Sequence, residues 1–219
     1  MPTFVLIHGA GDSPFYWHLV EAELTARGHA VVVPSLPCDD EDAGLAEYAD
    51  TVVEAIGDRR EVILVAQSAA AFTAPLVCTR LPVDLIVLVA GLVPVPGETG
   101  DAWWEATGHP GIAPEADGGG AIALFYHDVP GELAAEALRH GREQAARPGR
   151  EPWPLDAWPD VPTRYLLCRE DRLLPAAWLR GVVHERLGIT PDEIDAGHCA
   201  ALSRPAELAD CLVRYRLEL

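Results

Sequence analysis

Short, continuously apolar runs alternate along the chain with longer segments whose apolar positions recur at helical spacing. Apolar runs that are rich in β-branched residues and bounded by turn residues predict strands buried on both faces. The amphipathic segments between them predict helices. The predicted strands are Thr3–His8, Ala30–Val33, Val62–Val65, Leu85–Ala90, Arg164–Cys168 and a short strand at Ile194; the predicted helices run from Pro14 to about Arg27 and over Leu45–Ile56, Ala71–Cys78, Ala176–Leu187 and Arg204–Tyr215.

The regular alternation of strand and helix determines the predicted fold class. Successive strands joined by helices form parallel βαβ units, and strands that are apolar throughout need helices on both faces of their sheet. We therefore predict an α/β protein with a mostly parallel, doubly wound sheet. The 219 residues suffice for one such domain, residues 1–219.

The alternation stops at Gly91 and resumes near Arg164. The intervening residues, about 93–162, are rich in Gly, Pro and Trp. They contain two segments of helical character, Ala121–Phe125 and Glu132–Ala146, but no strong strand. We interpret this stretch as an insertion that lies over the carboxyl edge of the sheet as a small lid. The core of the domain then consists of residues 1–92 and 163–219.

The formal net charge of −18 excludes some classes of partner. Nucleic acids and anionic membranes are bound through basic patches, so we expect neither here. The charge mostly describes an acidic, solvated surface and does not identify a substrate. The sequence contains no Lys, which excludes Schiff-base, lysine general-base and pyridoxal phosphate chemistry.

Three features bear on the cellular location. The chain enters its first strand without a basic or cleavable leader, and its longest apolar run, Leu85–Val93, is too short to span a bilayer. The five cysteines are widely spaced and form no C-x-x-C pair, which favours a reducing compartment and gives no zinc-binding pattern. We expect a cytoplasmic protein, and the absence of Lys and Asn is typical of a GC-rich bacterial genome.

A serine stands at the junction between the third predicted strand and the helix that follows it. Ser68 has Ala66 and Ala70 two positions away on either side. A sharp strand-to-helix turn that lifts a nucleophile clear of the backbone needs small residues there, as in the G-x-S-x-G nucleophile elbow. The pentapeptide alone is a weak signal, because alanine-rich turns that contain serine are common.

Four chemically distinctive segments follow predicted strands, and the carboxyl ends of the strands form the ligand site of a doubly wound sheet. They supply a hydroxyl, a carboxylate, an imidazole and a glycine-rich turn. An imidazole can accept a serine proton, a carboxylate can fix the imidazole tautomer, and the backbone N–H groups of Ala10 and Ala69 can bind an oxyanion. The segments are His8-Gly9-Ala10-Gly11, Ser68, Arg169-Glu170-Asp171 and Gly197-His198.

These segments resemble those of the α/β-hydrolase superfamily, and the resemblance extends over essentially the whole chain. Within the superfamily, the chain is similar to the compact group that contains plant methylesterases, hydroxynitrile lyases and their bacterial relatives. The motifs that carry the resemblance are Phe4-Val5-Leu6-Ile7-His8-Gly9-Ala10, the Ser68 elbow, Asp171-Arg172-Leu173-Leu174-Pro175, and Gly197-His198 followed by Leu202-Ser203-Arg204-Pro205-Ala206-Glu207-Leu208.

The resemblance implies an α/β-hydrolase fold and a division of roles among five residues. Ser68 would be the nucleophile, His198 the base and Asp171 the acid, with the amides of Ala10 and Ala69 as the oxyanion hole. It implies neither a cofactor nor a metal ion. The elbow departs from the family pattern, because alanines replace the usual glycines on both sides of the serine.

Four residues are candidates for lining the substrate pocket. Gln67 occupies a position where many relatives carry His, and it could reshape the pocket. Trp17, Trp103 and Trp104 are candidates for an aromatic wall, but tryptophans that pack a lid onto the body would give the same sequence pattern. Glu170 is the alternative to Asp171 as the acid.

Two other histidine-containing segments have structural interpretations. His8, at the end of the first strand, is expected to form hydrogen bonds that shape the oxyanion turn rather than to act as a base. His127-Asp128 resembles half of a metal site, but no second pair accompanies it in the sequence. A helix cap or a loop contact is the expected role of this pair.

We expect a cofactor-independent serine hydrolase that cleaves a small or medium hydrophobic ester through an acyl-enzyme on Ser68. Thioesters and lactones are not separated from esters by the sequence. One alternative is a ligand-binding or signalling protein of low turnover on the same fold. Another is a hydroxynitrile-lyase-like enzyme, although plant lyases of this group place near the base a lysine that this chain lacks. The expected partner is a small-molecule ester, and a homodimer is compatible with the sequence.

Overall fold

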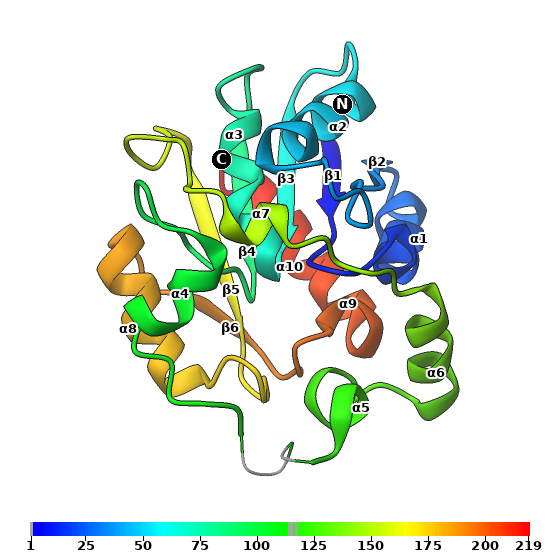
Figure 1. Ribbon diagram of the computed structural model, residues 1–219. Coiled ribbons are helices and arrows are strands. Elements are labelled where there is room, and N and C mark those ends of the chain that lie inside the picture. Colours follow the sequence, from blue (N-terminus) through cyan, green and yellow to red (C-terminus); the bar gives the residue numbers. More distant parts are fainter. Residues whose placement is uncertain (1, 114–115, 117) are drawn as a thin grey trace.

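The computed structural model describes residues 2–113, 116 and 118–219, which build a parallel sheet flanked by helices (Figure 1). The strands pair in the order β2-β1-β3-β4-β5-β6, and every pair is parallel. This arrangement confirms the predicted α/β class with a doubly wound sheet. The strands are β1 (Thr3–Ile7), β2 (Ala30–Val32), β3 (Val62–Gln67), β4 (Leu85–Val89), β5 (Thr163–Cys168) and β6 (Asp192–Ile194).

The central strands form the core of the protein, because they are apolar throughout and covered on both faces. Every residue of β1, β3 and β4 is buried. β3 continues two residues beyond the predicted strand, since Ala66 and Gln67 pair with Leu88 and Val89 of β4. Ile7, the last residue of β1, pairs with Ala66, so the loop after β1 begins beside the turn that follows β3.

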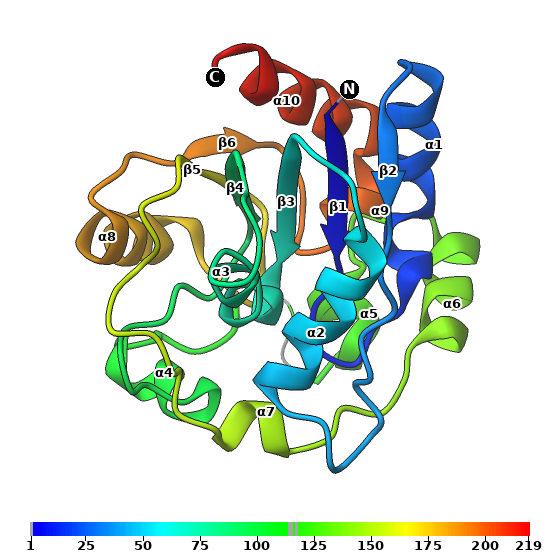
Figure 2. The same ribbon diagram turned by 90° about the horizontal axis from the view of Figure 1, so that it is seen from above.

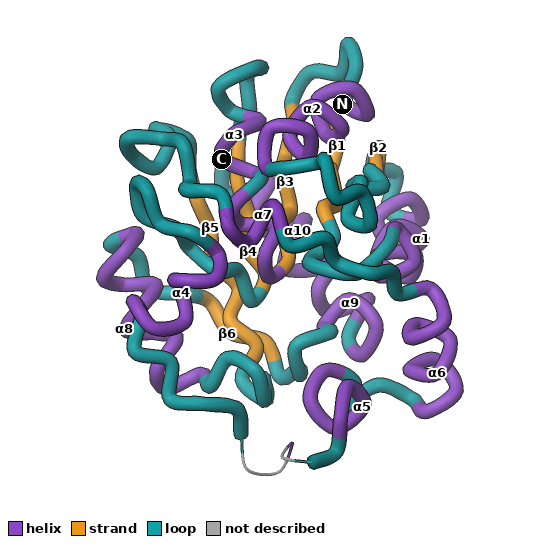
Figure 3. Tube along the Cα trace, viewed as in Figure 1, coloured by secondary structure: helices purple, strands orange, loops and turns teal. Residues whose placement is uncertain are grey.

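Helices of the core cover both faces of the sheet (Figures 1 and 2). α1 packs against α10 on one face, α2 packs against α3 on the other, and α8 packs on β5. Figure 3 shows the strands at the centre of this arrangement. None of the helices in the described part of the chain is long and apolar enough to cross a membrane. The core helices are α1 (His18–Ala26), α2 (Leu45–Ile56), α3 (Ala74–Val77), α8 (Ala176–Leu187), α9 (Ala200–Ser203) and α10 (Pro205–Leu217).

Residues 93–162, here called the inserted segment, connect β4 to β5 and contain helices but no strand within their described part. These helices lie beyond the carboxyl ends of the strands, where the sequence predicted a small lid (Figures 1 and 2). The helix predicted at Ala121–Phe125 is present as α5. The helices of the segment are α4 (Gly100–Ala106), α5 (Gly120–Phe125), α6 (Gly131–His140) and α7 (Arg147–Arg150).

The prediction of one helix over Glu132–Ala146 is wrong in its second half. α6 ends at His140, and Gly141 has an extended backbone with a ψ of 148°. Beyond it, the Arg142 N–H donates a hydrogen bond to the Gly11 carbonyl at 2.8 Å, and the Ala145 N–H donates to the Cys38 carbonyl at 2.7 Å. Because these donors bind carbonyls of the core, they cannot continue the hydrogen-bond pattern of the helix.

A buried ion pair fixes the start of the inserted segment to α8. The side chains of Arg186 and Glu98 are only 9% and 5% exposed. Arg186 Nη2 donates to Glu98 Oε1 at 2.8 Å, and its Nη1 donates to the Val93 carbonyl at 2.6 Å. The Trp103 indole N–H donates to the same carbonyl at 2.9 Å, and the guanidinium lies 5.8 Å from the Trp103 ring centroid.

Removal of one charge of this pair should destabilise the protein strongly. We expect Glu98→Ala to lower the free energy of unfolding by about 3–5 kcal/mol, because Arg186 would remain as an unpaired buried charge. The double variant Glu98→Ala/Arg186→Met should be more stable than the single variant for the same reason. Urea unfolding measures both, and Glu23→Ala, which removes an exposed pair with Arg27, serves as the control that changes stability little. A Glu98→Ala protein as stable as the parent would show that the ion pair does not anchor the segment.

Candidate active site

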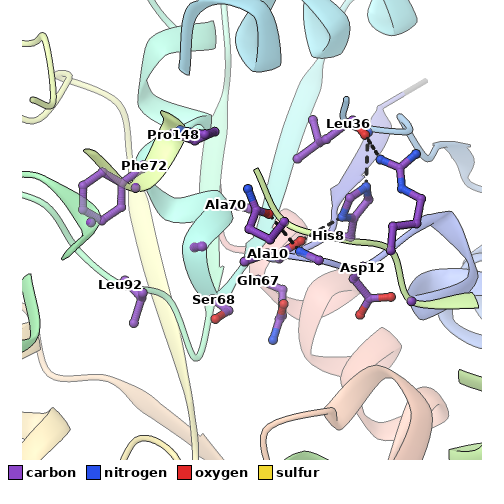
Figure 4. A pocket seen from close by; sticks show the side chains of 18 of the residues that line it. His8, Ala10, Asp12, Leu36, Gln67, Ser68, Ala70, Phe72, Leu92 and Pro148 are labelled. Carbon is purple, nitrogen blue, oxygen red and sulfur yellow. Dashed lines mark hydrogen bonds between the residues drawn. The ribbon is translucent and has the colours of Figure 1, made fainter. Parts of the chain in front are cut away.

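A cavity of about 880 Å³ lies at the carboxyl ends of the strands, between the sheet and the inserted segment. Its walls come from the loops that follow β1 and β3, from the loop that precedes α9, and from α4, α5 and residues 141–149. Figure 4 shows part of this wall, with Ser68 and Gln67 at the end of β3 and Asp12 on the loop after β1.

Ser68 occupies a sharp turn between β3 and the helix that follows it. Its φ of +53° lies in the left-handed region, which is strained for a residue other than glycine. β3 ends at Gln67, and a 3₁₀ helix, Ser68–Phe72, begins at once; α3 follows after Thr73. The helix predicted over Ala71–Cys78 is therefore divided into two short pieces. The strained, positive-φ turn is the geometry of a nucleophile elbow, in which the hydroxyl is lifted clear of the backbone.

His198 and Asp171 form a buried hydrogen-bonded pair beside the same cavity. The His198 Nδ1–H donates to Asp171 Oδ2 at 2.7 Å, which leaves Nε2 as the unprotonated nitrogen of the neutral ring. Asp171 Oδ1 accepts the backbone N–H groups of Leu173 and Leu174 at 2.8 and 2.9 Å. Glu170, the alternative acid, is exposed. The carboxylate that orients the imidazole is thus that of Asp171.

His8 shapes the turn that carries Ala10. Its Nδ1–H donates to the Gly9 carbonyl at 2.9 Å, and its Nε2 accepts the Leu36 N–H at 3.2 Å. Burial lowers the pKa of His8 to about 4, so the ring is neutral and both nitrogens are used in structural hydrogen bonds. A Cβ at Gly9 would lie 2.3 Å from Gln67 Oε1 and 3.1 Å from Ser68 Cβ, so the absence of a side chain at Gly9 allows this turn to lie close to the elbow. His8 therefore has the structural role expected from the sequence.

The neutral state of His8 should make stability depend on pH. Its pKa is lower in the folded protein than in the unfolded chain, so its contribution is complete above about pH 6.5 and is lost as the pH falls toward 4. We expect this loss to reach about 3 kcal/mol of unfolding free energy. His8→Asn, which has no titrating ring, should show a correspondingly flatter dependence of the unfolding free energy on pH. Urea unfolding at several pH values measures the slope, with the exposed His184→Asn as control; equal slopes for parent and His8→Asn would contradict the prediction.

Residues of the inserted segment form hydrogen bonds with the loop after β1 and hold it in place. The Arg142 N–H donates to the Gly11 carbonyl at 2.8 Å, and Gln144 Oε1 accepts the Gly11 N–H at 2.9 Å. Gln144 Nε2 also donates to the Tyr48 hydroxyl of α2 at 3.1 Å. The backbone next to Ala10 is therefore fixed by residues that are distant from it in the sequence.

The structure brings together the residues that the sequence predicted for the catalytic machinery. Ser68, His198, Ala10 and Ala69 line one cavity, and Asp171 lies behind His198. Ala69 is the second residue of the 3₁₀ helix that begins at Ser68, so its N–H belongs to the first turn, where backbone donors lack partners within the helix.

Two of the four residues expected in the substrate pocket do not line it. Gln67 and Trp104 are part of the cavity wall, as predicted. Trp17 and Trp103 are fully buried in the core and are absent from that wall, so their assignment to the pocket is wrong. The Trp103 indole points at the Val93 carbonyl, and Trp17 packs edge-on against Tyr16. Adjacent residues of a helix face different directions, which is why Trp103 and Trp104 differ.

The two neighbouring tryptophans should therefore respond differently to truncation. Trp103→Ala should lower the unfolding free energy by about 3–5 kcal/mol, because it removes a fully buried aromatic side chain. Trp104→Ala should change the ratio of kcat/KM between short-chain and bulky esters, with a smaller loss of stability. Thermal unfolding and kinetics on a series of esters test both variants. A substrate preference altered by Trp103→Ala and not by Trp104→Ala would reverse the assignment.

One residue that positions His198 was not recognised as such in the sequence. Asp128 Oδ2 accepts the Gly197 N–H at 2.7 Å, and His127 Nε2 donates to the Glu170 carbonyl at 2.9 Å. A Cβ at Gly197 would lie 2.6 Å from Asp128 Oδ1, so this contact also requires glycine. The pair His127-Asp128 thus makes loop contacts, the expected role. The sequence could not name the partner, because Asp128 and Gly197 are 69 positions apart.

Metal-ligating clusters and thiols are two further kinds of group that could take part in chemistry at the site. Within the described residues, no group of three or more His, Cys, Asp or Glu side chains is arranged to hold a metal ion. The five cysteines are free thiols. Cys199, next to His198, lines the cavity, but burial raises the pKa of its thiol well above the ordinary value. That thiol therefore stays protonated beside the site.

Comparison with known proteins identifies the family. Residues 4–211 match the sequence model of the α/β hydrolase family. The chain belongs to the α/β-hydrolase family. The structure of this hydrolase superposes on polyneuridine aldehyde esterase with a TM-score of 0.84 at 19% identity, covering 98% of this chain and 99% of the other. It superposes on a pyrethroid hydrolase from Sphingobium faniae JZ-2 with a TM-score of 0.79 at 21% identity, covering 98% and 97%. At these identities the likeness shows the shared fold.

The sequence of this α/β hydrolase also matches characterised relatives over most of its length. It is 27% identical over 245 aligned residues to Methylesterase 7 from Arabidopsis thaliana, covering 96% of this chain and 94% of the relative. It is 26% identical over 248 residues to Norfluorocurarine synthase 2 from a Strychnos species, covering 96% and 93%. The resemblance to the plant methylesterase group that the motifs indicated is therefore confirmed.

Proposed function

We propose that this α/β hydrolase is a serine hydrolase that cleaves carboxylic esters. The observation that supports the proposal most directly is the meeting, in one cavity, of the strained Ser68 with the hydrogen-bonded pair of His198 and Asp171. The similarity to Methylesterase 7 over 96% of the chain supports the same class of reaction.

In this proposal, Ser68 Oγ attacks the carbonyl carbon of the ester while its proton passes to His198 Nε2. Asp171 stabilises the imidazolium, and the backbone N–H groups of Ala10 and Ala69 bind the oxyanion. His198 then gives the proton to the alcohol oxygen as the C–O bond breaks, which leaves an acyl group on Ser68. Water attacks this acyl-enzyme while His198 accepts the water proton, and His198 then returns that proton to Ser68 Oγ as the acyl C–O bond breaks, which releases the carboxylic acid and restores the free serine. Each step uses a group of this chain, so the mechanism requires no cofactor.

The size and the lining of the cavity favour a substrate with a hydrophobic acyl group of small or medium size. Its volume of about 880 Å³ lies within the range of small-molecule sites. One part of its wall is formed by apolar side chains, among which are Leu45, Phe72, Leu92, Trp104 and Pro148. The same chemistry serves thioesters and lactones.

The central test is whether Ser68, His198 and Asp171 act as a unit. Ser68→Ala and His198→Ala should each lower kcat by about a millionfold, and the double variant should lose little more, because triad residues are not additive. Asp171→Asn should cost up to about ten-thousandfold, since the amide favours the wrong imidazole tautomer. Kinetics on a short-chain aryl ester measure these losses, and thermal unfolding confirms that Ser68→Ala is folded.

A fluorophosphonate probe provides an independent measurement. It should label Ser68 in the parent protein and in the control Ser203→Ala, and it should fail to label Ser68→Ala. Substantial activity in Ser68→Ala, or a label on Cys199 or Ser203, would refute the proposal. Stoichiometric binding of an ester with no turnover by the parent would instead favour a ligand-binding protein.

A further inference from the structure

Asp12 is a carboxylate in the cavity wall that the proposed mechanism does not use. It follows the turn that carries Ala10 and lines the same cavity as Ser68 and His198. Its Oδ1 accepts the backbone N–H of Ser13 at 2.8 Å. Within the described residues, no ion pair joins Asp12 to a cation. Its charge is therefore available to a molecule in the cavity.

Arg142, which also lines the cavity, forms no ion pair with Asp12, because its guanidinium is engaged by residues 35–39. It donates to the Leu36 carbonyl and, at 3.1 Å, from Nε to Cys38 Sγ. It also lies 3.6 Å from the carboxylate of Asp39. These contacts hold the guanidinium against residues 35–39 of the core.

The environment of Asp12 favours a cationic partner. Burial raises the pKa of Asp12 to about 6, although Arg142 and His198 act in the opposite direction. The carboxylate is then mostly ionised at pH 7.5 while it lacks much of the solvation that a free carboxylate has. A cation placed in the cavity would replace that missing solvation, and the net charge of −18 also attracts cations to the protein.

Gln67 gives a second, independent sign of a polar ligand. Its side chain is part of the cavity wall although the residue is only 3% exposed. Among the described residues, no protein group forms a hydrogen bond with its amide, and the amide is not one of the polar groups sealed from solvent, so it is accessible from the cavity. In Figure 4 the side chain of Gln67, at the end of β3, and that of Asp12, on the loop after β1, extend in the same direction. A polar group of a ligand at this place could bind both.

The position of His198 indicates which part of an ester would meet these side chains. The alcohol oxygen must come within hydrogen-bond reach of His198 Nε2 to receive its proton. Asp12 is close enough to His198 to interact with it electrostatically. An alcohol portion that extends from His198 along the wall of this cavity can therefore reach Asp12.

We propose that Asp12 and Gln67 form a polar subsite that selects esters whose alcohol portion carries a protonated amine. Asp12 provides the counter-charge, and Gln67 provides a hydrogen-bonding amide next to the reacting carbonyl group. The inference rests on the proposed ester hydrolysis and specifies its substrate class. It assigns to Asp12 a role in specificity rather than in proton transfer.

The test compares two esters of the same acid that differ only in one charged atom. The 2-(dimethylamino)ethyl ester is protonated at pH 7.5, and the 3-methylbutyl ester is its neutral counterpart of the same shape. The parent protein should have a kcat/KM about tenfold or more higher for the amine ester. Asp12→Asn should reduce this ratio by at least about fivefold, and Gln67→Met should reduce it by less. The ratio cancels any general loss of activity, and Asp12→Ser replaces the Asn variant if that variant does not fold.

Glu136→Gln is the matched control, because Glu136 is an exposed acidic residue of α6 that does not line the cavity. It removes one negative charge without a change at the subsite, so the ratio should stay as in the parent. A ratio near one in the parent, or a ratio that Asp12→Asn leaves unchanged, would overturn the inference. An equal fall of the ratio in Glu136→Gln would also overturn it, because that result would reflect only the overall negative charge of the protein. If the parent cleaves neither these two esters nor the aryl ester, both the proposed ester hydrolysis and the inferred subsite are refuted. If the parent cleaves both esters without preferring the charged one, only the subsite is refuted.

Discussion

The parallel pairing of β1 with β3 is the constraint on which the site depends. Because Ile7 lies opposite Ala66, the loop that begins at His8 leaves the sheet beside the turn at Ser68. The contact is so close that a Cβ on Gly9 would meet the Gln67 side chain at 2.3 Å. Since all paired strands run in one direction, the segments that end in Asp171 and His198 emerge at the same edge. A shift of register by one residue would exchange the side chains between the two covered faces and displace these loops relative to one another.

The inserted segment completes the site as well as covering it. Gln144 fixes the loop after β1 through Gly11, and Asp128 fixes the loop before His198 through the Gly197 N–H. Both contacts place a polar side chain of the segment on a backbone group of the core. The segment is itself held to α8 by the buried pair of Arg186 and Glu98. Stability of the segment and geometry of the site are therefore coupled.

Two carboxylates stand near His198, and their hydrogen bonds separate their roles. Asp171 accepts two backbone N–H groups and the imidazole N–H, so its oxygens are fully engaged. Asp12 accepts one backbone N–H and faces the cavity. The difference arises from the loops: the turn after β5 directs the N–H groups of Leu173 and Leu174 at Asp171, whereas the turn after β1 offers only that of Ser13. The carboxylate of Asp171 is thus fully occupied by hydrogen bonds within the protein, whereas that of Asp12 remains available to a ligand.

The sequence by itself determined the strands and the parallel sheet and indicated Ser68, Asp171 and His198 as the candidate triad, because hydrophobic periodicity and short motifs are local signals. It did not determine which side of a helix or loop faces the cavity. Trp103 and Trp104 are adjacent in the chain, yet only Trp104 reaches the cavity. The sequence also did not show that α6 would end at His140, or that Asp12 would face the cavity near His198. Those outcomes depend on hydrogen bonds and burial between residues far apart in the chain, which exist only once the sheet and the inserted segment have packed together.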